Sequence, residues 1–133
     1  NLKFHPVTNV ERYRDMICGK AKVVEGDMYT HFKMARMVIG AATGAIVEAA
    51  SLGIPVINIV NKSELSFNYL PDYGKGVIWD SVETGVELSG LIEKFDYALE
   101  NDGANLAESA KKIKEMCFCE PTDQKIIEAF DLV

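Results

Sequence analysis

The sequence predicts a mixed α/β fold in which a parallel sheet is covered by helices. Short apolar runs, such as residues 36–40 and 55–60, alternate with segments whose apolar residues repeat at helical spacing. The runs are apolar throughout, as strands buried on both faces require. With 48% hydrophobic and 26% charged residues, the composition is that of an ordinary globular protein. We therefore expect one Rossmann-like domain with a three-layer parallel sheet over residues 1–133.

The first third of the chain is assigned from its apolar runs and its capping residues. Strands are expected over residues 2–4 and 21–24, and helices over 10–18 and 27–34. Pro6 ends the first strand, because proline cannot donate to a ladder. Thr8 or Asn9 can cap the first helix and Asp27 the second, since their side chains accept hydrogen bonds from free N–H groups.

The rest of the chain continues the alternation. Strands are expected over residues 36–40, 55–60 and 76–79, and helices over 43–52, 88–99, 106–117 and after Pro121. Gly53 is typical of the residue that follows a helix. The polar and aromatic segment 61–75 is expected to form a loop. The terminal helix in residues 122–133 either folds back on this domain or crosses to another one.

Charge and cysteine content exclude several classes of function. The formal net charge of −6 argues against nucleic-acid binding and against an anionic membrane surface, since both favour a basic patch. The three cysteines, Cys18, Cys117 and Cys119, fit neither a disulfide framework nor a zinc spacing. We expect them to be reduced and mostly buried in a cytoplasmic protein. With two histidines and no D-x-D pair, neither a metal nor another cofactor is expected.

The turn at residues 40–44 is the most informative segment, because it links a predicted strand to a predicted helix. Small residues let a ligand approach its backbone: Gly40, Ala41, Ala42 and Gly44. The free N–H groups at the start of the helix, at residues 43–45, favour an anion. The Thr43 hydroxyl can cap the helix or donate to a phosphate oxygen. The turn is neither G-x-G-x-x-G nor a P-loop, and a plain capped helix is the alternative.

Glu48 adds to the case for a nucleotide ligand. Its neighbours on the same face of the predicted helix are small, namely Gly44, Ala45 and Ser51. A carboxylate on such a face, about one turn beyond a phosphate site, can accept hydrogen bonds from both hydroxyls of a ribose. The alternative is a solvated Glu on the exposed side of the helix.

These residues resemble a known motif. Gly40-x-x-Thr43-x-x-x-x-Glu48-Ala49-x-x-x-Gly53-x-Pro55 is similar to the donor-site motif of glycosyltransferases with the two-domain GT-B fold, and sugar-nucleotide 2-epimerases carry a similar run. The resemblance implies that this chain is the C-terminal, donor-binding half of such a protein. It also implies that Thr43, with the N–H groups of Gly44 and Ala45, faces the donor diphosphate, and that Glu48 binds the ribose.

Two further segments extend the resemblance. Phe4-His5-Pro6 resembles the His-Pro element of bacterial capsule and wall-polymer transferases, which implies that His5 contacts a phosphate or the leaving group. The alternative is a surface histidine before a turn. Asp27-Met28-Tyr29 resembles a segment that lines the nucleobase pocket. The chain departs from the family at residues 41–42, where Ala-Ala replaces a Ser-rich turn and removes side-chain donors.

The resemblance predicts a function for the parent protein. The chain opens Asn1-Leu2-Lys3-Phe4 without an initiator Met and within a strand-like pattern, so we expect a piece of a longer protein. The expected partners are a nucleotide-diphosphate sugar and an N-terminal acceptor domain of the same protein, through which alone the protein would associate with a membrane. The expected role is donor binding in surface polysaccharide biosynthesis, with the piece inactive by itself.

Three alternatives remain open. The chain could be half of a UDP-sugar 2-epimerase, which would use the same turn and the same Glu48. It could be a non-catalytic Rossmann-like binding module, which predicts an exposed Glu48 and no nucleotide binding. A phosphoacceptor regulatory domain would need an acidic cluster at the strand ends, which Asp27 and Asp80 do not form convincingly.

Overall fold

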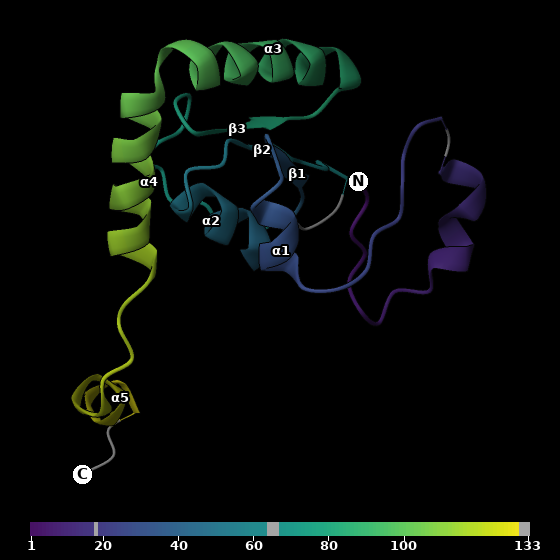
Figure 1. Cartoon of the computed structure of the whole chain (residues 1–133). Helices are drawn as coiled ribbons and strands as arrows, with labels where there is room; N and C mark the ends of the chain where they lie inside the picture. Colours follow the sequence, from purple (N-terminus) through teal and green to yellow (C-terminus); the bar gives the residue numbers. More distant parts are fainter. Residues whose placement is uncertain (18, 64–66, 131–133) are drawn as a thin grey trace. The chain divides into compact units, whose positions relative to one another are not determined.

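The computed structural model describes residues 1–17, 19–63 and 67–130 (Figure 1). The chain divides into two compact units, Asn1–Ala35 and Arg36–Val133. Both contain parallel strand pairing and helices, so the α/β class predicted from the sequence is confirmed. The interpretation as a single domain stays a prediction.

The first unit is built from short elements. They are the 3₁₀-helix η1 (Val10–Met16) and the α-helix α1 (Met28–Phe32). Both expected caps are present, since the Asn9 side chain accepts from the Glu11 N–H and the Asp27 side chain from the Thr30 N–H. In place of the two expected strands, the structure has a single parallel bridge between Leu2 and Val23. The local sequence thus predicts where the elements lie better than how long they are.

The second unit holds the main sheet. Its elements are β1 (Val38–Gly40), α2 (Gly44–Ser51), β2 (Val56–Ile59), β3 (Trp79–Val82), α3 (Gly85–Asn101), α4 (Gly103–Cys117) and α5 (Asp123–Phe130). The strands are parallel in the order β1-β2-β3. In this register Gly40, Asn58 and Ser81 form one row across the sheet. The row lies near the carboxyl ends of the strands, where open α/β sheets bind their ligands.

Helices pack on both sides of this sheet, with α3 above it and α2 below it in Figure 1. On the α3 side, Ile57 and Val82 form a buried cluster with Phe95. On the α2 side, Ile46 lies directly against Gly40. Burial of such side chains away from water is the main force that holds helices on a sheet.

The position of β3 corrects the prediction of a strand over residues 76–79. The strand begins at Trp79 instead, because the preceding residues form a turn. Gly74 and Gly76 have φ values of +81° and +80°, a region that glycine enters without strain. The Ile78 N–H donates to the Gly74 carbonyl at 2.9 Å. Of the apolar run at residues 76–79, Ile78 is buried in the turn, Val77 is exposed, and only Trp79 belongs to the strand.

Two expectations of burial are wrong. The strand expected over residues 36–40, which is β1, was predicted to be buried, but it is only partly covered and Ile39 is 43% exposed. The cysteines were expected to be mostly buried, but Cys117 and Cys119 are exposed and free, since α4 ends at Cys117 and Phe118 continues as extended chain. Cys18 lies outside the described residues.

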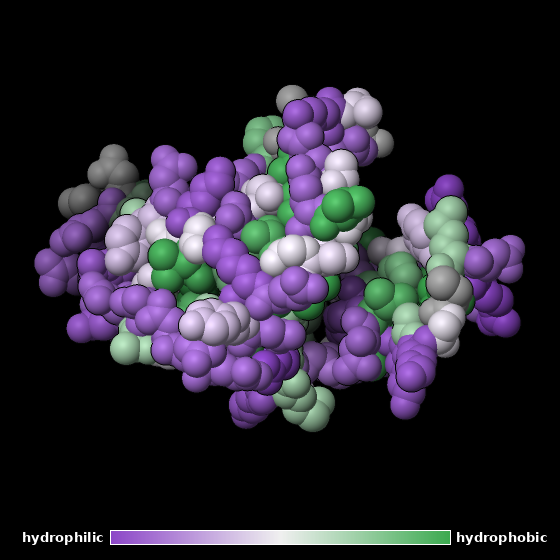
Figure 2. Space-filling view, turned by 90° about the horizontal axis from the view of Figure 1, so that it is seen from above, coloured by the Kyte–Doolittle hydropathy of each residue, from purple (hydrophilic) through white to green (hydrophobic). Residues whose placement is uncertain are grey.

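Hydrophilic residues cover most of the face shown in Figure 2, and hydrophobic residues show between them in several places. Among the described residues, no helix combines the length and the apolar character that crossing a membrane requires. In that same part of the chain, no three or more His, Cys, Asp and Glu side chains gather in a way that could hold a metal ion.

Replacing Thr84 should destabilise α3. The Thr84 hydroxyl accepts from the Glu87 N–H, and the Glu87 carboxylate accepts from the Thr84 N–H, a reciprocal capping box. We expect Thr84→Ala to lower the free energy of unfolding by about 1 kcal/mol in a urea titration. Ser89→Ala, at an exposed position inside the same helix, should leave it unchanged within a few tenths of a kcal/mol. Equal effects of the two substitutions would contradict the assignment of the cap.

Candidate functional site

The end of β1 and the start of α2 meet at Gly40. A Cβ atom at this position would lie 2.7 Å from Cγ2 of Ile46, closer than any side chain tolerates. Glycine therefore allows the first turn of α2 to lie against the end of the strand. This close approach brings the N–H groups at the start of α2 to the carboxyl edge of the sheet.

The turn between the two elements holds an unusual backbone conformation. Ala42 has a φ of +43° and is the one non-glycine residue with a positive φ among the described residues. An L-residue in this region is strained, at a cost on the order of 1 kcal/mol. The chain then returns to an extended conformation at Thr43, with φ −135° and ψ 141°. Strain of this kind is typical of ligand-binding turns.

Thr43 caps α2, as the sequence predicts. Its Oγ1 accepts from the Ala45 N–H at 3.4 Å, and its carbonyl accepts from the Ile46 N–H at 3.3 Å. Gly44 is exposed and is the first residue of the helix. The positive end of the helix dipole is thus accessible at Gly44 and Ala45, where an anion is stabilised.

The start of α2 differs from the starts of the other helices in the described part of the chain. Each of those has an acidic residue at its cap or in its first turn: Glu11, Asp27, Glu87, Asp102 and Asp123. In α3, the N–H groups of Glu83 and Thr84 donate to the Glu87 carboxylate and lower the pKa of that group. The first turn of α2 has no such carboxylate. An external anion would therefore meet no carboxylate in the first turn of this helix.

Glu48 lies on α2, one turn beyond Gly44. Its side chain is half-buried, and its helix neighbours Ala45 and Ser51 are small, as expected. Ser51 does not use its hydroxyl on the carboxylate, because that hydroxyl donates to the Glu48 carbonyl at 2.7 Å. Within the described residues, no hydrogen bond or ion pair involves the Glu48 carboxylate. The carboxylate can therefore accept hydrogen bonds from a ligand.

The remaining predicted site residues lie in the first unit. His5 is exposed, and its Nδ1 accepts a long hydrogen bond of 3.4 Å from the Val7 N–H. Asp27 caps α1, because its Oδ2 accepts from the Thr30 N–H at 2.9 Å. Met28 is half-buried and Tyr29 exposed. Asp27 thus has a structural role of its own, and the nucleobase pocket implied by the resemblance stays a prediction.

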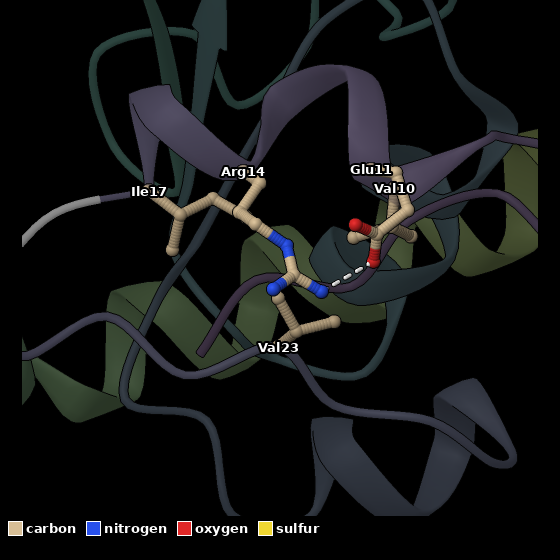
Figure 3. Close-up of a pocket in the computed structure, with 5 residues that line it drawn as sticks. All are labelled: Val10, Glu11, Arg14, Ile17 and Val23. Carbon is tan, nitrogen blue, oxygen red and sulfur yellow. Dashed lines mark hydrogen bonds and ion pairs between the residues drawn. The ribbon is translucent and has the colours of Figure 1, made fainter.

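A hollow in the first unit offers no competing site. It is lined by Val10, Glu11, Arg14, Ile17 and Val23 (Figure 3). Its one charged pair is internal, since Arg14 donates to the Glu11 carboxylate at 2.7 Å. Both charged side chains are largely exposed, and the rest of the lining is apolar. No residue of the predicted site lines this hollow.

Asn58 is a candidate residue that the sequence reasoning missed. It is 3% exposed, in the middle of the otherwise apolar strand β2, and lies in the same row as Gly40. A single Asn within the run Pro-Val-Ile-Asn-Ile-Val is a signal that could have found it, because polar residues are rare in the centre of a buried strand.

Comparison with protein-family models, with curated proteins and with solved structures found no match to this chain.

Substitutions at Gly40 and Gly44 should have different effects on stability, because Gly40 lies against Ile46 and Gly44 is exposed. Gly40→Ala places a Cβ atom against Ile46, so we expect the free energy of unfolding to fall by about 1–3 kcal/mol. Gly44 has no atom within 4 Å of an added Cβ, so Gly44→Ala should leave stability unchanged or raise it by up to about 1 kcal/mol. Urea unfolding of both variants tests this, and a Gly40→Ala protein as stable as the wild type would contradict it.

Proposed function

We propose that the second unit of this chain binds the diphosphate of a nucleotide sugar at the start of α2. The main support is that this helix start is accessible and has no carboxylate in its first turn. The other described helices have one at the cap or in the first turn. Backbone N–H groups and the helix dipole would then hold the phosphates. Ala41 and Ala42 add no side-chain donors, so the backbone and Thr43 carry this role.

Glu48 supplies the second half of the proposed recognition. A carboxylate without a partner in the described residues, half-buried and flanked by Ala45 and Ser51, can accept hydrogen bonds from the two hydroxyls of a ribose. Its partial burial argues for this role over that of the solvated Glu expected of a binding module without a nucleotide ligand. Hydrogen bonds to an ionised group contribute about 1.5–3 kcal/mol.

The parent protein would be a glycosyltransferase of the GT-B type, with this chain as its donor half and a Rossmann-like, three-layer fold. In such a reaction the leaving nucleotide diphosphate gains negative charge as the glycosidic bond to it breaks. N–H groups fixed at the start of α2 would stabilise that charge without reorganisation. The roles that the resemblance implies for His5 and for residues 27–29, which lie in the first unit, stay predictions.

A 2-epimerase would use the same turn and the same Glu48. The two activities differ in what the full-length parent does with a UDP-sugar and no acceptor. Release of the epimerised sugar would favour the epimerase, whereas an acceptor requirement would favour the transferase.

Nucleotide titrations test the proposal directly. We expect the chain to bind one of UDP, CDP and GDP saturably in isothermal calorimetry. Glu48→Gln should weaken that binding by about 1–3 kcal/mol, because the charged acceptor is lost. Glu93→Gln, at an exposed position on α3, is the control and should bind as the wild type does. Failure to bind any of the three, or equal weakening by both substitutions, would contradict the proposal.

A further inference from the structure

We draw no further inference here: the strongest candidate, the apolar face that Ile126, Ile127 and Phe130 expose on the terminal helix α5, carries none, because nothing in the structure shows what covers it.

Discussion

The close contact between Gly40 and Ile46 is the constraint on which the candidate site depends. The strand end and the helix start can approach this closely because no side chain separates them. The contact fixes where α2 begins and places its first N–H groups at the carboxyl edge of the sheet. Ala42 accommodates the resulting tight turn by adopting a left-handed conformation. The charge preference of the site follows from this geometry, because the helix dipole and the free N–H groups favour an anion.

The lack of a carboxylate in its first turn distinguishes α2 from α3. In α3, Glu87 occupies the place that an external anion would take, and the donated N–H groups lower the pKa of its carboxyl. In α2 the corresponding place is accessible, and the nearest carboxylate on the helix is that of Glu48, one turn further on. A ligand with a diphosphate followed by a diol fits these two features in order. That order is the physical basis of the nucleotide-sugar proposal.

Capping residues and turn glycines, which act between residues close in the sequence, predicted much of the fold. Features that depend on residues far apart in the sequence could not be predicted in this way. The cap at Thr43 and the positive-φ Gly53 act within one turn of the chain, so α2 could be predicted almost to its ends. The start of β3 could not, because Gly74 and Gly76 place the residues before Trp79 in a turn. The predicted site residues from Gly40 to Glu48 lie within one short segment of the sequence, so a single motif indicates them. Asn58 was missed, because its relation to Gly40 depends on the pairing register of two strands.

Binding of an anion at the first turn of α2 can be tested most directly by amide chemical shifts. The measurement is a nitrogen–proton correlation spectrum of the labelled chain during titration with UDP, CDP or GDP. We expect saturable shifts that are largest at the amides of Gly44 and Ala45. Shifts that centre on the start of α3, around Gly85, or that never saturate, would contradict it.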